Sequence, residues 1–329
     1  MKKGKILSGM RPTGGLHVGH LSVLENWVKL QDEYECFFTI VDWHALTTSF
    51  METEIIPKNI QEMALDWLSV GIDPEKSCIF IQSQVKQHAE LHLLLSMIIP
   101  LSWLERCPTY KDQIQQLSAE GKDIATYGFL GYPLLQAADI LIYKADTVPV
   151  GEDQLPHLEM CREIARRFNY LYNTNVFPEP KAKLAKISLL PGLDKRKMSK
   201  SYNNYISISE DKKSLEKKVA QMVTDPNRIH KTDPGNPDVC VVHTYHGIYN
   251  QLAKDEITKS CRQGIIGCVA CKKQLAAHMD DALKPYREKR QYFADRPQLV
   301  EEILYHGKEK AAKHAEATMQ EVRKVMHLY

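Results

Sequence analysis

The chain has 329 residues, of which 43% are hydrophobic and 26% are charged, a balance typical of a soluble globular protein with room for two domains. The sequence has no apolar run of the roughly 20 residues that span a bilayer and no secretory signal at its start, so we expect a cytoplasmic protein with no membrane partner. The formal net charge of +2 divides into −8 over residues 1–180 and +10 over residues 181–329. A basic C-terminal part indicates either a polyanionic partner or solvated helix faces.

Strands and helices alternate along the first half of the chain. Short apolar runs predict strands, and the almost unbroken run at 36–46 is typical of a strand buried in a parallel sheet. Segments with a period near 3.6 residues predict helices between these runs. The predicted strands are 5–9, 36–46 and 78–83, and the predicted helices are 17–34, 55–71 and 89–107.

This order predicts an α/β fold of Rossmann type, with a doubly wound parallel sheet and right-handed crossovers. From residue 208 onward the strand pattern disappears, and the sequence becomes polar, helical and rich in lysine. We therefore predict a Rossmann-type domain over residues 1–206 and an all-helical domain over residues 207–329.

Two histidines open the first predicted helix, in the stretch PTGGLHVGH. Their spacing of three places His17 and His20 on one face of the first turn, where free backbone N–H groups and the helix dipole favour an anion. Gly19 between them has no side chain, so a flat ring could lie against the backbone. The stretch contains neither a Walker A motif nor G-x-G-x-x-G, the two common phosphate-binding patterns.

A second candidate is the stretch DKRKMSKSYNN, whose residues 197–201 we name the lysine loop. Its two ammonium groups, on Lys197 and Lys200, could close over phosphates and neutralise the charge of departing pyrophosphate. Most lysine clusters of this kind are solvated surface loops, so this stretch alone does not decide between the two readings.

Together the two stretches resemble the paired motifs of class I aminoacyl-tRNA synthetases, in which a histidine-rich helix start and a lysine loop enclose ATP with its Mg²⁺. The resemblance implies that His17, His20, Lys197 and Lys200 are the catalytic residues. The family most often has isoleucine where this chain has Val18, which is a conservative change.

The resemblance also implies further contacts to ATP. Most come from the loop after the first strand, from the stretch GED and from the lysine loop, and the others are Gly19 between the two histidines and the separate positions Lys111 and Ile187. Some relatives have glutamine in place of Arg11. Ile187 is matched to an adenine contact by its single position only. The implied residues are Arg11, Pro12, Thr13, Gly19, Lys111, Gly151, Glu152, Asp153, Ile187, Met198, Ser199 and Ser201.

The stretches DWHALTT, AADILIY and VPVGEDQLPH occur in the order found in tryptophanyl-tRNA synthetases. Asp139 lies in an apolar helical run, where a carboxylate without a hydrogen-bond donor would be costly. An indole N–H is such a donor, so Asp139 could recognise tryptophan; the alternative is a structural aspartate bonded to backbone amides. The resemblance places Tyr132 and Gln154 near the amino group of the substrate and His44 in the pocket wall.

We therefore predict ATP-dependent activation of L-tryptophan and its transfer to tRNA(Trp), with residues 1–206 catalytic and residues 207–329 meeting the anticodon. Tyrosyl-tRNA synthetases are the main alternative, because they share both motifs and a phenol O–H could also donate to Asp139. A small-molecule nucleotidyltransferase shares the histidine pair but lacks the lysine loop and the basic helical part. The family implies a homodimer, for which residues 93–104 are a candidate interface or, equally, core.

Four of the eight cysteines have the spacing C-x20-C-x6-C-x2-C, and four thiolates suit either zinc or a 4Fe–4S cluster. A subset of bacterial tryptophanyl-tRNA synthetases carries a 4Fe–4S cluster at nearly this spacing, so the resemblance implies a cluster with a structural role. The four candidate ligands are Cys240, Cys261, Cys268 and Cys271. The other cysteines are predicted to be core residues: Cys36, Cys78, Cys107 and Cys161.

Overall fold

The computed structural model describes residues 2–107, 125–184, 190–200 and 202–328. In this part of the chain, five parallel strands form one sheet in the order β3-β2-β1-β4-β5. This arrangement confirms the predicted α/β fold. The order changes direction between β1 and β4, and ligands of such sheets bind at the carboxyl ends of the strands at this point. The strands are β1 (Lys5–Met10), β2 (Glu35–Ile40), β3 (Ser77–Ile81), β4 (Thr147–Val150) and β5 (Lys181–Leu184).

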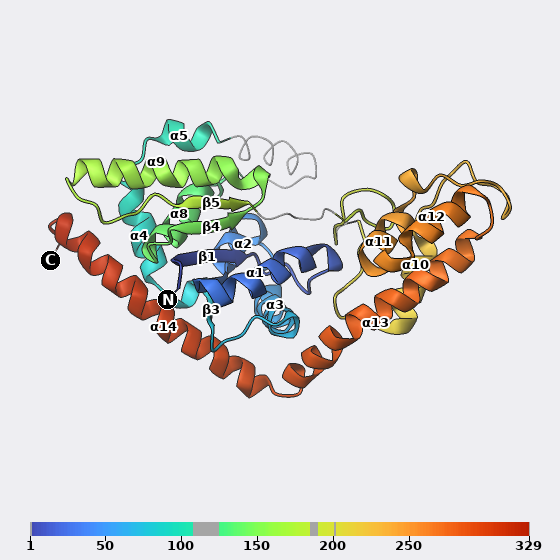
Figure 1. The fold of residues 1–329 in the computed structure, drawn as a ribbon. Coiled ribbons are helices and arrows are strands. Elements are labelled where there is room, and N and C mark those ends of the chain that lie inside the picture. Colours follow the sequence, from blue (N-terminus) through green and yellow to red (C-terminus); the bar gives the residue numbers. More distant parts are fainter. Residues whose placement is uncertain (1, 108–124, 185–189, 201, 329) are drawn as a thin grey trace.

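Helices cover both faces of the sheet (Figure 1). On one face, α1 and α3 enclose a core that includes Trp27, Phe38 and Trp67, and on the other α4, α8 and α9 enclose a second core that includes Phe37 and Tyr143. The helices are α1 (Leu21–Glu33), α2 (Asp42–Ser49), α3 (Ile56–Val70), α4 (Gln87–Ser96), α5 (Leu101–Glu105), α7 (Tyr127–Leu130), α8 (Tyr132–Ile142) and α9 (Leu155–Leu171).

Strand β2 explains why the sequence contains an unbroken apolar run. Successive side chains of a strand point to opposite faces, so Phe38 stacks on Trp27 with ring centroids 4.6 Å apart, while Phe37 stacks on Tyr143 at 4.5 Å. Because both faces of the sheet are covered, both sets of side chains are apolar.

Two predicted boundaries are wrong. The strand predicted over 36–46 ends at Ile40, and α2 begins at Asp42, because a continuous apolar run does not by itself distinguish a strand from a buried helix. The helix predicted over 89–107 is two helices, α4 and α5, separated at Pro100, whose backbone is extended and which precedes the first turn of α5.

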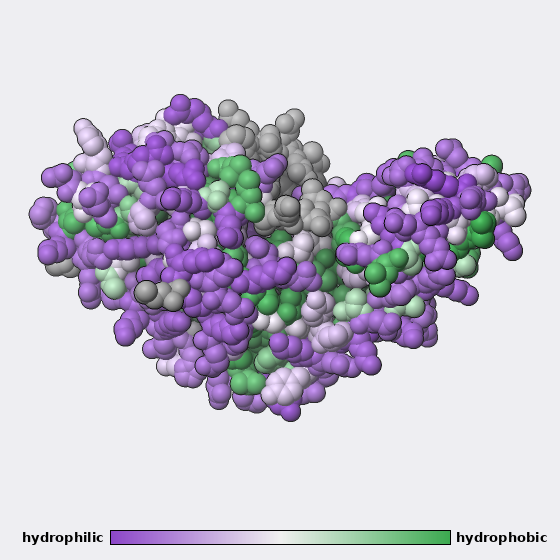
Figure 2. Space-filling model, viewed as in Figure 1, coloured by the Kyte–Doolittle hydropathy of each residue, from purple (hydrophilic) through white to green (hydrophobic). Residues whose placement is uncertain are grey.

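After residue 206 the described chain contains helices and no strand, as predicted. Figure 1 shows α10, α11, α12 and the first part of α13 gathered beside the sheet domain, and Figure 2 shows a mostly hydrophilic outer surface on this lobe. Within the described residues, no helix has both the length and the hydrophobicity needed to cross a membrane. These helices are α10 (Lys212–Gln221), α11 (Val241–Tyr249), α12 (Lys254–Arg262) and α13 (Cys268–Ala294).

The last helix, α14 (Pro297–Val325), does not stay with this lobe. It runs back beneath the sheet, and its buried residues Ala311, Ala315 and Met319 join the core around α4 and α8 (Figure 1). At Gly307 a Cβ would lie 1.8 Å from the carbonyl oxygen of Ile79 in β3, so only glycine permits this approach. Part of the range 207–329 thus packs with the Rossmann-type domain, and the boundary at residue 206 stays a prediction.

Candidate active site

The stretch PTGGLHVGH connects β1 to α1, and we name residues 11–16 the nucleotide loop. His17 precedes a single turn of 3-10 helix, Val18–His20, and its backbone N–H donates to Nδ1 of His20 at 3.3 Å. The two imidazole centroids are 3.8 Å apart, so the rings share one face as predicted. A Cβ on Gly19 would lie 3.0 Å from the ring of His17, which is tighter than an ordinary contact.

Both imidazoles are neutral at physiological pH. Burial, the neighbouring His20 and the charge of Lys200 lower the pKa of His17 to about 3. Burial and Lys200 lower the pKa of His20 to about 4. Each ring therefore offers one N–H donor without bringing a positive charge of its own.

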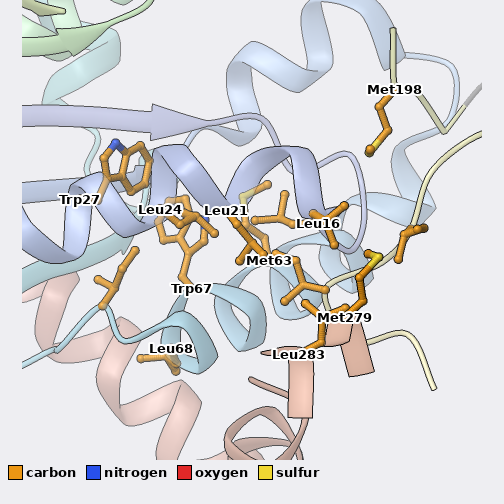
Figure 3. Close-up of a cluster of buried hydrophobic side chains, with 14 of the residues drawn as sticks. Leu16, Leu21, Leu24, Trp27, Met63, Trp67, Leu68, Met198, Met279 and Leu283 are labelled. Atoms are coloured by element: carbon orange, nitrogen blue, oxygen red, sulfur yellow. The ribbon is translucent and has the colours of Figure 1, made fainter. Parts of the chain in front are cut away.

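The lysine loop lies directly against the nucleotide loop. The ammonium Nζ of Lys200 donates to the carbonyl oxygen of Thr13 at 2.8 Å and would lie 3.2 Å from a Cβ on Gly14. Met198 is buried and anchors the lysine loop in the core cluster that also contains Leu16 of the nucleotide loop; both residues are labelled in Figure 3. The backbone N–H of Ser199 donates to Asn204 at 2.8 Å. Two stretches about 180 residues apart in sequence thus meet at one place, as predicted.

A cavity of about 230 Å³ lies at the carboxyl ends of β1 and β4, and its lining includes Met10, which directly precedes the nucleotide loop. The residues implied as tryptophan contacts, His44, Tyr132, Asp139 and Gln154, all line it, and so does Gly151. The ring of His44 meets that of Tyr132 edge to face, with centroids 4.4 Å apart. The structure therefore brings the residues implied to bind tryptophan together in one pocket.

Asp139 is the most completely bonded group of this pocket. Its Oδ2 accepts from Nε2 of His44 at 2.9 Å, its Oδ1 accepts from Nδ1 of His88 at 2.6 Å, and Nε2 of Gln82 is 2.8 Å from both oxygens. Burial alone would raise the pKa of the carboxyl, but the bonds from the two histidines outweigh it and hold the pKa below its usual 3.8. The donors are side chains, not the backbone amides of the alternative reading.

The structure describes some of the other residues that the resemblance implies as ATP contacts. Pro12 is buried, Thr13 is exposed, and the positive charge of Arg11 is close enough to lower the pKa of Tyr132, which burial raises overall. Gly151 and Glu152 follow β4, with Glu152 exposed. Lys111, Ile187, Ser201 and the side chain of Asp153 lie outside the described residues.

Sequence reasoning missed one residue that lines the pocket and two that bond to Asp139 from outside the lining. Gln82 and His88 reach Asp139 from the end of β3 and the start of α4. Gln136 lies one turn before Asp139 on α8 and lines the cavity, and its Oε1 has no hydrogen-bond partner among the described residues. The only available signal was that side chains after neighbouring parallel strands converge at one edge of the sheet.

The four candidate cysteines also come together, in the helical lobe. Cys240 directly precedes α11, Cys261 is near the end of α12, and Cys268 and Cys271 are in the first turn of α13. Burial and the neighbouring thiols raise the pKa of Cys271 to about 12. By contrast, the other four cysteines are buried core residues, as predicted.

Arg228 lies between these sulfurs. Its Nη1 is 3.8 Å from Sγ of Cys261 and 3.8 Å from Sγ of Cys268, and its Nη2 donates to the carbonyl oxygens of Lys231 and Ile266. Across the described ranges, no three histidine, cysteine or acidic side chains are grouped closely enough to hold a single metal ion. Two of the four thiols therefore contact a guanidinium group.

Comparison with known proteins agrees with this geometry. A family model described as tRNA synthetases class I (W and Y) matches residues 1–284. The tryptophan–tRNA ligase of Thermotoga maritima is 51% identical over 98% of this chain and 99% of its own length, and that of Aquifex aeolicus is 45% identical over 98% and 100%.

A solved structure of a similar protein has the same fold. The tryptophanyl-tRNA synthetase of Campylobacter jejuni, complexed with ADP and tryptophan, has a TM-score of 0.89 and 33% sequence identity, and the match covers 98% of this chain and 99% of that one. The chain therefore belongs to the class I tRNA synthetases of the tryptophan and tyrosine group and, within it, to the tryptophan–tRNA ligase family.

Proposed function

We propose that this chain activates L-tryptophan with ATP and transfers it to tRNA(Trp). The carboxylate of tryptophan attacks the α-phosphorus of Mg-ATP, the bond to the β-phosphate oxygen breaks, and pyrophosphate leaves. The terminal adenosine hydroxyl of the tRNA then attacks the carbonyl carbon of the adenylate and releases AMP. The observation that carries the proposal is the contact of Lys200 with the nucleotide loop, which begins directly after Met10, a residue that lines the cavity containing Asp139.

For the nucleotide end, we propose that His17 and His20 donate hydrogen bonds to the α-phosphate and that Lys197 and Lys200 hold the departing pyrophosphate. The two imidazoles are neutral and share one face. The chemistry requires no side-chain nucleophile, because catalysis of phosphoryl and nucleotidyl transfer is mostly positioning and charge stabilisation. Mg²⁺ enters as part of the substrate Mg-ATP.

For the amino-acid end, we propose that the indole ring enters the cavity toward Asp139 and His44, with the ammonium group near Tyr132 and Gln154. Each oxygen of Asp139 already accepts two bonds, so an indole N–H reaches it only by replacing one of the present donors. His44 is the donor placed to yield, because its ring lines the cavity, whereas His88 is also bonded to Tyr143 at 2.6 Å.

In the helical lobe, we propose a 4Fe–4S cluster held by the four cysteines, with zinc as the alternative. A zinc ion draws four sulfurs to about 2.3 Å from itself, whereas a four-iron cluster keeps its cysteines farther apart around a larger body. Nη1 of Arg228 lies 3.8 Å from two of the four sulfurs, those of Cys261 and Cys268, and four thiolates suit either group. The choice of iron over zinc rests on the resemblance to the bacterial tryptophanyl-tRNA synthetases that carry such a cluster. The cluster would tie α11, α12 and α13 together beside the tRNA anticodon.

The cluster has a direct chemical test. Protein purified anaerobically should contain about four iron and four sulfide per chain, the content of one cluster, and absorb visible light. Changing Cys271 to serine should remove most of the iron, while the same change at the buried Cys161 should leave it. One zinc per chain and no iron, in protein that charges tRNA, would refute the cluster and leave the assignment as a ligase intact.

We also propose a homodimer that acts in the cytoplasm. Within the run 93–104, Leu93, Met97 and Leu101 are 54%, 68% and 57% exposed, which is unusual for large apolar side chains so close together. In a dimer, these side chains would be buried against a second copy of the chain, which explains why they are exposed in a single copy. Sedimentation should give a dimer for the natural chain and monomers when Met97 and Leu101 are both changed to glutamate.

The central test is pyrophosphate exchange into ATP, measured with tryptophan and tyrosine in parallel. Exchange should depend on tryptophan, and tyrosine should support it at least 10³-fold less efficiently, roughly the discrimination that polar recognition of a side chain supplies. Equal exchange with tyrosine would favour a tyrosyl enzyme. Exchange with neither amino acid would favour a small-molecule nucleotidyltransferase, which needs its own acceptor for the adenylyl group.

A further inference from the structure

We infer that Asp66 and Arg290 form a positioning pair that fixes the nucleotide loop for ATP and connects this loop to helix α13. Neither residue belongs to the two motifs, and neither lines the cavity that contains Asp139. The inference rests on the proposed activation of tryptophan with ATP, and it concerns the affinity for ATP in particular.

Asp66 bonds the loop on one side and α13 on the other. It lies on α3 and is 1% exposed. Its Oδ2 accepts the backbone N–H of Leu16 at 2.5 Å, and its Oδ1 accepts Nε of Arg290 at 2.8 Å. Arg290 also donates to the carboxylate of Glu62, one turn earlier on α3. A single buried carboxylate therefore joins residues that are far apart in sequence.

Leu16 is the residue through which this pair reaches the imidazoles. It directly precedes His17 and is 2% exposed, so its polar backbone groups need partners inside the protein. Its N–H is bonded to Asp66, and its carbonyl oxygen accepts the N–H of Ile208, which follows the lysine loop, at 3.0 Å. Both backbone groups of Leu16 are thus hydrogen-bonded. Because His17 is the next residue, the position of Leu16 determines where the His17 imidazole lies.

The apolar contacts beside the pair make this link rigid. Figure 3 shows Met279 and Leu283 of α13 pointing toward Leu16 and toward Met63 of α3, and all four are buried in one core cluster. Helix α13 begins at the candidate cysteines and carries Arg290 near its other end. A displacement of α13 would therefore act on the nucleotide loop through Arg290 and Asp66.

Charge gives Arg290 a second effect. A Cβ on Gly15 would lie 3.7 Å from Oδ2 of Asp66 and 3.8 Å from Oε2 of Glu62, so two carboxylates stand directly behind the nucleotide loop. Both also interact with Lys200, where their charges oppose the lowering of its pKa by burial. Without Arg290, the carboxylates of Asp66 and Glu62 would repel the triphosphate and would attract the ammonium group of Lys200 away from it. Both effects would weaken ATP binding.

The test compares Arg290→Gln with the matched control Arg323→Gln. Arg323 is similarly buried and also joins two carboxylates, those of Glu90 and Glu316, but it ties α14 to α4, away from the nucleotide loop. Arg290→Gln should raise KM for ATP in tryptophan-dependent exchange roughly tenfold, the scale of one lost charge-assisted hydrogen bond, and leave KM for tryptophan within about twofold. Arg323→Gln should leave both KM values within about twofold.

Two further variants separate positioning from folding. Arg290→Lys keeps the charge and should restore about half of the lost ATP affinity on a logarithmic scale. Asp66→Asn combined with Arg290→Gln should raise KM for ATP by clearly less than the product of the single effects, because the two residues act as one unit. Equal changes in the KM values for ATP and tryptophan, or multiplicative single effects, would overturn the inference.

Equilibrium binding of ATP keeps this test independent of the proposed function. Arg290→Gln should raise the Kd for ATP by the same factor as KM, even in a chain that performs no tryptophan-dependent exchange. If the natural chain lacks such exchange while this Kd shift is present, the proposed function fails and the positioning pair stands. If exchange is normal and the Kd is unchanged, only the positioning pair fails.

Discussion

Asp139 and Lys200 belong to the two ends of the proposed site, the amino-acid end and the nucleotide end, and the protein holds them in opposite ways. Asp139 is 2% exposed, and three side chains from different elements donate to it. Lys200 is only partly buried and donates one hydrogen bond, to the carbonyl oxygen of Thr13. The amino-acid end is a fully bonded network in the free protein, in which Gln82 and His88 stay bonded to Asp139 while His44 yields to the indole, whereas the nucleotide end has a single ammonium group that can exchange its present partner for a phosphate.

The difference follows from what each end must do. A buried polar network that is only partly satisfied is costly, so a pocket that reads one side chain is best completed before the substrate arrives. The nucleotide end must admit a large, highly charged ligand and release pyrophosphate, which a fully bonded loop would hinder. Substitution of Asp139 at the first end should therefore change stability and activity together, and substitution of Lys200 at the second should change activity alone.

The largest effect is expected at the amino-acid end, from Asp139→Ala. Three buried donors would lose their acceptor, so the free energy of unfolding should fall by roughly 3–5 kcal/mol, the scale for breaking a buried ionic network. Tryptophan-dependent exchange should fall below detection. Denaturant unfolding and exchange on the same preparation measure both quantities.

Its control is Asp225→Ala in the helical lobe. Asp225 is 8% exposed and accepts two backbone N–H bonds, so its loss should also reduce stability. It should leave KM for tryptophan within about threefold. Asp139→Ala protein that is as stable as the natural chain would show that the network is not the preorganised end described above.

Lys200→Ala should give the next largest effect, and it should act on rate without acting on stability. Loss of one preorganised charge contact to the leaving pyrophosphate should lower the adenylation rate by roughly 10²–10³-fold, while the single bond to Thr13 contributes little to folding. Single-turnover formation of the adenylate measures the rate, and thermal unfolding measures the stability. The exposed Lys212→Ala is the control and should stay within threefold in rate. A Lys200 variant with the natural rate would mean that the loop is only surface.

The two ends also differ in how well the sequence predicts them. His17, His20 and Lys200 are recognisable because each lies in a short local motif, and the motif carries its own backbone geometry. Asp139 was recognised as a buried acid that needs a donor, but the donors Gln82 and His88 are single residues on other elements, which only the fold brings within reach. No local pattern identifies such partners.

The same reasoning applies to the helices that support each end. An amphipathic pattern predicts that α14 buries one face but not which surface it covers, so its return to β3 was not foreseen. Asp66 and Arg290 are separated by 224 positions, and a charged residue on a helix is normally solvated. Their pairing depends on the angle at which α13 crosses α3, which the sequence does not specify locally.

The smallest expected effect is a pH dependence that distinguishes the two ends. The folded-state pKa values of His17 and His20, about 3 and about 4, lie below the 6.5 of an unfolded histidine, so the unfolded chain takes up protons first as the pH falls. Their contribution to stability is complete above pH 6.5 and is lost progressively below it. Asp139 also has a lowered pKa, but its contribution is lost only around and below pH 3.8.

Between pH 6.5 and pH 4.5 the nucleotide end should therefore contribute to the loss of stability, and the Asp139 carboxyl should not. His20→Gln should flatten the decline of the unfolding free energy over this interval, measured by urea denaturation at a series of pH values. The exposed His306→Gln should keep the natural slope. Because ATP places negative charge beside the imidazoles, saturating ATP should also flatten the decline in the natural chain and should have a smaller effect in the His20 variant. If ATP flattened the decline equally in both proteins, its phosphates would bind away from His20. The contrast between a loosely held nucleotide end and a fully bonded amino-acid end would then have no basis.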